Sequence, residues 1–205
     1  MTGAARWDAA AAAEGRHLLQ HPAAWLMIAV ATVIVGWVIA VYNRLVSLRV
    51  RARNAWADVD VQLKRRYDLI PNLVAVVQGY ASHEKALLED VARLRSEALA
   101  AEGAARREGP DAALTGAIRS LFAVAEAYPE LRADTAFRRL QEQLADIEDN
   151  LQYARRYYNA VVRDMNTAME VFPQNLVALI FGFRRLPYFQ AGDREREAVQ
   201  VQMDG

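Results

Sequence analysis

The 205-residue sequence contains no cysteine and only three histidines. Without cysteine the chain cannot form a disulfide, a thiolate zinc site, an iron–sulfur cluster or a thiol nucleophile, and its redox compartment cannot be read. It also lacks an excess of either charge, because 25 basic and 25 acidic residues cancel. No global field therefore favours nucleic acid or an acidic ligand, and any electrostatic polarity must come from local patches.

The motifs of common enzyme sites are missing as well. The sequence has no glycine-rich phosphate loop, no nucleophile elbow and no dinucleotide fingerprint. His83-Glu84 is the only HE pair, and no second histidine follows at the spacing of a helical zinc site. The paired carboxylates Glu89/Asp90 and Glu148/Asp149 point about 100° apart on a helix and cannot share a proton. We therefore expect no enzyme, no cofactor, no metal, no small-molecule substrate and no nucleic acid.

What the chain does contain is one long uncharged apolar run, PAAWLMIAVATVIVGWVIAVY, residues 22–42. A bilayer core about 30 Å thick needs ~20 helical residues, which this run supplies. A cleaved signal peptide is the competing interpretation, but its apolar region is about 7 to 15 residues long and ends at a small-residue cleavage site. We interpret residues 22–43 as an uncleaved transmembrane helix, with Trp25 and Tyr42 as interfacial aromatics.

Basic residues are distributed unevenly around this helix. Only Arg6 and Arg16 precede it, whereas Arg44, Arg49, Arg51, Arg53, Lys64, Arg65 and Arg66 follow it. The positive-inside rule then predicts that the N-terminus lies outside and the long C-terminal part lies in the cytoplasm. Residues 1–21 read as a disordered N-terminal extension, and residues 191–205 as a charged tail.

Beyond the membrane run, apolar residues recur at the spacing of helices. The clearest pattern runs from Phe137 to Phe172, where steps of four and three alternate over 36 residues, as in a heptad seam. Part of this seam needs cover from the first two helices or from another chain, because the predicted third helix is only about half as long as the fourth. The first predicted helix reaches about residue 66 and the second occupies about 70–102. A third helix of about 18 residues holds Leu114 to Ala125, and the fourth covers 137–172, with breaks at 102–110 and 127–135.

No strand-like alternation occurs, so the fold class is all-α. We expect the N-terminal transmembrane helix to continue into an antiparallel up-and-down bundle of long helices covering residues 44–172.

The segment QLKRRYDLIPNLVAVVQGYASHE, residues 62–84, combines a proline with three cations. Asp68 is a good N-cap and Pro71 would be the third residue of a new helix, where its missing N–H costs nothing. The segment is therefore predicted to be a turn between two helices at the membrane-distal tip. The alternative is a surface that contacts a protein partner, formed by Lys64, Arg65, Arg66, Asp68 and Asn72.

Two blocks of this sequence stand out: the first is YNRLVSLRVRARNAWADVDVQLKRRYDLIPNLVAVVQGYASHE, and the second is YNAVVRDMNTAMEVFPQNLVALIFGFRRLPYF. Together they resemble the LemA family of bacterial membrane-anchored helical proteins. The resemblance covers roughly residues 42–190 and implies a single N-terminal membrane helix followed by a helical bundle. It implies a bacterial inner membrane as the location, and it supplies no reaction. About 20 residues precede the membrane helix, where many family members have only a few.

Two further features point to interactions. Thr32, Gly36 and Ala40 form a row of small residues on one face of the span, which either allows close helix association or occurs by chance in an alanine-rich span. The segment QNLVALIFGFRRLPYF, 174–189, lies within an amphipathic C-terminal segment, residues 173–190. It either lies in the membrane interface or packs on protein. The residues expected at the interface are Phe181, Phe183, Arg184, Arg185, Tyr188 and Phe189.

The sequence thus favours a non-enzymatic, single-pass membrane scaffold that binds the lipid bilayer, self-associates as a homo-oligomer and organises or remodels the membrane. The alternative is an adaptor that presents its membrane-distal tip to a protein partner such as a membrane protease or an envelope-stress component.

Overall fold

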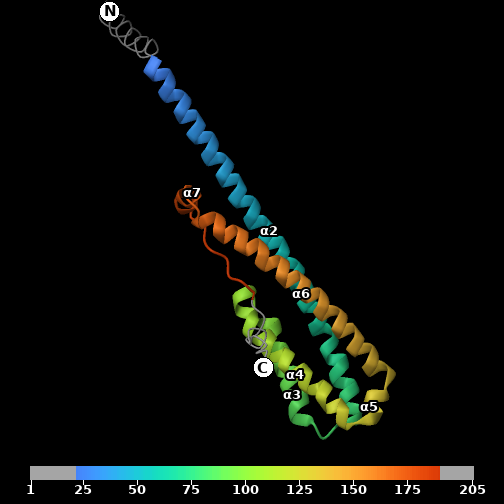
Figure 1. The fold of residues 1–205 in the computed structure, drawn as a ribbon. Helices are drawn as coiled ribbons and strands as arrows, with labels where there is room; N and C mark the ends of the chain where they lie inside the picture. The colour runs from blue at the N-terminus through green and yellow to red at the C-terminus, as the bar shows by residue number, and fades with distance from the viewer. Residues whose placement is uncertain (1–21, 190–205) are drawn as a thin grey trace, which may run out of the picture.

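The computed structural model describes residues 22–189, and over this range the chain is helical with no strand (Figure 1). The predicted all-α fold, with an N-terminal apolar helix that continues into an antiparallel bundle, is confirmed. The predicted extension 1–21 and tail 191–205 lie outside the described residues. The helices are α2 (Pro22–Tyr80), α3 (Lys85–Ala100), α4 (Ala104–Ala127), α5 (Pro129–Ala133), α6 (Thr135–Glu170) and α7 (Gln174–Ile180).

Helix α2 is a single helix of 59 residues, and the predicted break near residue 67 is wrong. Asp68 is not an N-cap, because Pro71 lies inside the helix. A proline in a helix interior removes the hydrogen bond to the carbonyl four residues earlier, which here is that of Tyr67. Arg95 of α3 replaces the missing donor, since its Nε donates to the Tyr67 carbonyl at 2.7 Å. The helix therefore continues past the proline without leaving this carbonyl unpaired.

The first reversal of the chain comes instead after Tyr80, and the second lies at residues 101–103. There Gly103 adopts a φ of 76°, which favours glycine, and α4 begins at the next residue. The predicted linker 102–110 is therefore too long, and Pro110 lies inside α4. The up-and-down order survives both corrections: α2 leads away from the apolar end, α3 returns, α4 leads away and α6 returns (Figure 1).

Helix α6 confirms the predicted 36-residue helix. Its N-cap is Asp134, whose carboxylate accepts a hydrogen bond from the Phe137 N–H at 2.9 Å. The helix packs antiparallel along α2, and both contribute to one buried core together with α3 and α4 (Figure 1). The seam is therefore covered within this chain from Phe137 to Ala168, whereas Phe172 lies beyond the helix and is 74% exposed.

The chain then makes a short return at the apolar end of the bundle. Pro173, which follows a cis peptide bond, precedes α7, and Gly182 ends that helix with a φ of 66°. The Phe183 N–H donates to the Ala178 carbonyl at 2.9 Å, the bond of a Schellman motif with glycine at C′. Residues 183–189, here called the strap, then run back along the bundle without regular structure (Figure 1).

Candidate functional site: the membrane-proximal end

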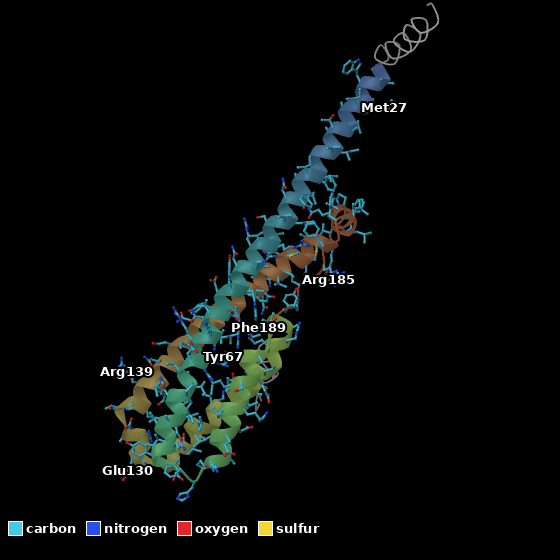
Figure 2. All side chains as sticks on the ribbon, turned by 180° about the vertical axis from the view of Figure 1, so that it is seen from behind. Met27, Tyr67, Glu130, Arg139, Arg185 and Phe189 are labelled. Carbon is cyan, nitrogen blue, oxygen red and sulfur yellow. The ribbon has the colours of Figure 1, made fainter. Side chains whose placement is uncertain are left out.

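The first third of α2 projects from the bundle as a bare apolar rod (Figure 1). This segment is long and apolar enough to cross a membrane, and only 6% of its most apolar window is buried. Met27 lies on this rod, far from the bundle end marked by Glu130 and Arg139 (Figure 2). The core helix of a soluble protein would bury these side chains. Their exposure is therefore typical of a helix that is surrounded by lipid.

Helix α7 lies beside the point where this rod meets the bundle (Figure 1). One of its faces is buried, because Val177 and Ala178 pack with Val41 and Leu45 of α2. The opposite face is apolar and exposed, with Leu179 79% and Ile180 76% exposed. We call this exposed face, together with the exposed apolar residues that flank α7, the α7 cap. It consists of Val171, Phe172, Leu176, Leu179, Ile180 and Phe181.

Aromatic contacts fix α7 to the end of the span. The ring of Tyr42 lies 4.8 Å from that of Phe181 and 5.9 Å from that of Phe183, measured between centroids. The Arg49 guanidinium lies over the Phe183 ring, 4.3 Å from its centroid, as a cation–π contact. The predicted interfacial residues Tyr42, Phe181 and Phe183 are therefore brought together, and Arg49 is a member of the group that the sequence pattern did not single out.

The strap does not follow the prediction for its last residue. Phe189 is 1% exposed, with its ring against Trp56 and under the Arg155 guanidinium of the bundle, so its assignment to the membrane interface is wrong (Figure 2). Burying this ring within the bundle removes more apolar surface from water than an exposed segment end could. Arg184 is exposed, Tyr188 is exposed, and Arg185 pairs with Glu170 at 2.9 Å.

Two asparagines of α6 hold the strap through its backbone. Asn166 donates to the Leu186 carbonyl and accepts from the Leu186 N–H, both at 3.0 Å. Asn159, seven residues earlier, pairs in the same way with Phe189 at 2.8 and 2.9 Å. The Tyr158 hydroxyl donates to the Pro187 carbonyl, and burial raises the pKa of this phenol. A seven-residue repeat of asparagine beside an apolar seam was the only sequence signal for this role.

The predicted membrane-distal tip does not exist at residues 64–72, because these residues lie midway along the bundle part of α2. Arg66 is buried and bonds to Asp111 of α4 and Glu148 of α6 at 2.5 and 2.9 Å. Its assignment as a contact residue is therefore wrong. The Tyr67 hydroxyl donates to the same Asp111 carboxylate, and burial, then the nearby Asp111 charge, raise its pKa.

The other predicted contact residues remain on the surface. Lys64, Arg65, Asp68 and Asn72 are exposed along the flank of α2. Arg65 and Asp68 line a shallow groove of about 360 Å³ against α6. The surface is therefore a side of the bundle, and the true distal end is formed by residues 81–84 and 128–134.

The row of small residues lies on the exposed part of the span. Thr32, Gly36 and Ala40 are all exposed, and a Cβ added to Gly36 would meet no atom within 4 Å. The Thr32 hydroxyl donates to the Ile28 carbonyl at 2.8 Å, so its polar group is satisfied within the helix. The row is accessible to a second helix in the membrane. Among residues 22–189, no group of three or more His, Asp or Glu is placed to hold a metal ion.

A helical bundle with one exposed apolar helix and an apolar cap beside it defines a membrane-associated helical protein. A model of the LemA family matches residues 55–203, and the chain belongs to that family.

Curated relatives agree with this assignment. Magnetosome protein MamQ of Magnetospirillum gryphiswaldense is 25% identical over 181 residues, which cover 74% of this chain and 66% of that protein. Magnetosome protein MamQ 2 of Paramagnetospirillum magneticum is 26% identical with the same coverage. Protein LemA of Metamycoplasma hominis is 23% identical over 163 residues, covering 78% of this chain and 73% of that protein. The chain thus spans slightly under two thirds of the length of the MamQ proteins.

Proposed function

We propose that this protein is a non-enzymatic membrane scaffold whose bundle is docked on the bilayer at two places, the α2 span and the α7 cap. The observation that carries the proposal is the position of the cap. Its exposed apolar side chains lie beside Tyr42, where the exposed apolar part of α2 ends. An amphipathic segment at that level lies at the boundary between headgroups and acyl chains.

Two attachment points restrict how the bundle can tilt. A single span leaves a protein free to tilt about the membrane surface, whereas a second contact limits that motion. The continuous helix α2 carries this constraint along the bundle, because it runs unbroken from the span to Tyr80. A bundle held upright in this way presents its flanks in a fixed orientation, which favours ordered assembly of several copies.

Self-association through the span is the second part of the proposal. Small residues at every fourth position let two membrane helices approach closely, and Thr32, Gly36 and Ala40 provide such a row. Light scattering of the full-length protein in mild detergent, with the detergent mass subtracted, measures the outcome. A discrete oligomer that dissociates in Gly36→Ile, but not in Ala31→Ile on another face of the helix, is expected. A monomeric wild type would overturn the scaffold.

The orientation follows from the basic residues after the span and is part of the same proposal. The chain contains no cysteine, so single cysteines report their location without background. In intact bacterial cells a membrane-impermeant maleimide should label a cysteine at Thr2, outside. It should label one at Gln78 only after lysis. Labelling of Gln78→Cys in intact cells would place the bundle on the other side.

An adaptor function is the second candidate. Its contact surface would be the groove lined by Arg65 and Asp68, in place of the predicted tip. Charge reversal separates the two functions. Arg65→Glu should abolish capture of a protein partner by an adaptor while leaving the oligomeric mass of a scaffold unchanged.

A further inference from the structure

The membrane-proximal end of the bundle is strongly basic although the whole chain carries no net charge. Seven arginines occur in the segments 44–53, 163–174 and 182–187, against two carboxylates. One of the two, Glu170, is already paired with Arg185. The arginines are Arg44, Arg49, Arg51, Arg53, Arg163, Arg184 and Arg185.

Three of these arginines line one cavity of about 420 Å³ between α2, the strap and the start of α4. Arg49 and Arg53 come from α2, and Arg184 comes from the strap. No carboxylate is among the lining residues, and none of these three arginines forms an ion pair within residues 22–189. Three like charges around one cavity repel each other unless an anion lies among them.

The rest of the lining is apolar and aromatic. Trp56, Tyr158, Leu186 and Pro187 form this part of the wall, and the Tyr158 hydroxyl is already used by the strap. A cavity with a cationic part and an apolar part matches an amphiphilic anion better than a fully hydrated one. Guanidinium groups bind phosphate oxygens through paired hydrogen bonds, which makes a phosphate ester the matching anion.

The position of the cavity indicates where such an anion comes from. Arg49 lies seven residues beyond Tyr42, or about 10 Å along the helix at 1.5 Å per residue. The headgroup layer extends about 5–7 Å from the acyl core on each side. The Arg49 side chain spans the remaining distance, and Arg184 comes three residues after Phe181, the last residue of the α7 cap, which the proposed function places at the same level. Arg53 lies about 6 Å farther along α2, on the side of the cavity away from the span.

We propose that this cavity binds the phosphate of an anionic phospholipid, through Arg49, Arg53 and Arg184. The inference rests on the proposed docking of the α7 cap. A lipid held there ties the strap and α2 to the same headgroup. The scaffold then selects membranes rich in anionic lipid.

The cavity carries its own reporter, because Trp56 lines it. The test uses full-length protein in mild nonionic detergent in which the other three tryptophans are phenylalanine. Dihexanoyl phosphatidylglycerol is titrated while Trp56 emission is recorded. We expect a saturable change, with a dissociation constant raised at least tenfold in Arg49→Gln/Arg53→Gln/Arg184→Gln.

A matched control has the same loss of charge at the far end of the bundle. Arg132→Gln/Arg138→Gln/Arg139→Gln removes three exposed arginines there and should bind as the unsubstituted protein does (Figure 2). Equal weakening in both triple variants would overturn the site, because it would reflect net charge alone. An equal response to dihexanoyl phosphatidylcholine would overturn the selectivity for anionic lipid.

Glycerol 3-phosphate distinguishes a lipid from a soluble phosphate ester, since it has the phosphate without acyl chains. Binding as tight as that of the phospholipid would overturn the lipid assignment. If the triple variant does not fold, the protein with all its arginines still tests the proposal. Its affinities for phosphatidylglycerol, phosphatidylcholine and glycerol 3-phosphate are then compared. The titration does not depend on oligomeric mass, so a failure of self-association and a failure of lipid binding are separate results.

Discussion

Arg66 of α2 and Asp111 of α4 form an ion pair of 2.5 Å in which each side chain is only 2% exposed. The same carboxylate accepts hydrogen bonds from Tyr67 and from Arg155 of α6, at 2.8 and 2.7 Å. One buried acid therefore connects three helices, and Asp111 follows directly after the proline inside α4.

Replacing this acid should destabilise the bundle strongly. Asp111→Ala leaves Arg66 without its closest partner in the interior, and removing one member of a buried pair costs about 3–5 kcal/mol. Guanidinium unfolding in mild detergent, followed by circular dichroism, measures the change. Asp90→Ala breaks an exposed pair with Arg93 and should cost at most about 1 kcal/mol. Equal losses in the two variants would show that the buried acid has no special role.

The bond from Arg95 to the Tyr67 carbonyl should matter only because Pro71 is present. Arg95→Ala leaves that carbonyl unpaired, which costs about 1–3 kcal/mol. In a Pro71→Ala background the new N–H at residue 71 can donate to the same carbonyl, so Arg95→Ala should cost much less. A double-mutant cycle on unfolding free energies tests this coupling. Additive effects would mean that Arg95 does not compensate for the proline.

The strap should detach when its asparagine contacts are removed. Asn166→Ala removes both hydrogen bonds to Leu186 at a cost of about 1–3 kcal/mol. That energy corresponds to a roughly 5- to 150-fold larger released population. Trypsin cleavage after the exposed Arg184 should accelerate accordingly. Asn150→Ala is the control on the same helix, because that side chain only donates to the Asp146 carbonyl. Unchanged cleavage in Asn166→Ala would contradict this account.

The folded protein should become less stable in acid because Asp134, the N-cap of α6, becomes protonated. The Phe137 N–H, and after it the Tyr80 hydroxyl, hold the pKa of Asp134 below its ordinary value of 3.8. A depressed pKa in the folded state stabilises the protein above the ordinary pKa, and this contribution is lost as the pH falls through the folded-state value.

Asp134→Asn keeps a capping side chain but removes the titration. The parent protein should be more stable than this variant at pH 6, and the difference should shrink as the pH falls below 3.8. Melting temperatures in detergent at several pH values measure it. A difference that does not change with pH would exclude the carboxylate as its source.

The sequence was most informative where one periodic pattern dominates. The alternating steps from Phe137 onward predicted α6 closely, and the uncharged run 22–42 predicted the exposed part of α2, because each depends on local spacing alone. The break assigned to Pro71 was wrong because its compensating donor, Arg95, comes from another helix. Local rules for proline cannot anticipate such a distant partner.

The residues of the candidate site also fall into those that the sequence could predict and those that it could not. Tyr42, Phe181 and Phe183 could be grouped from the sequence, since the up-and-down order returns residue 172 to the membrane end. The burial of Phe189 and Arg66 could not, because it depends on Asn159 and Asp111, polar residues whose partners lie 30 and 45 positions away.

The depth of the α7 cap in a bilayer tests the central claim most directly. The full-length protein, which is free of cysteine, carries one fluorescent label at Leu179→Cys or at Arg139→Cys and is reconstituted in nanodiscs containing doxyl-labelled lipids. Leu179 lies on the cap, and Arg139 lies at the far end of the bundle (Figure 2). We predict strong quenching at position 179 and none at 139. A label at 179 that is as unquenched as the one at 139 would contradict docking of the bundle on the membrane.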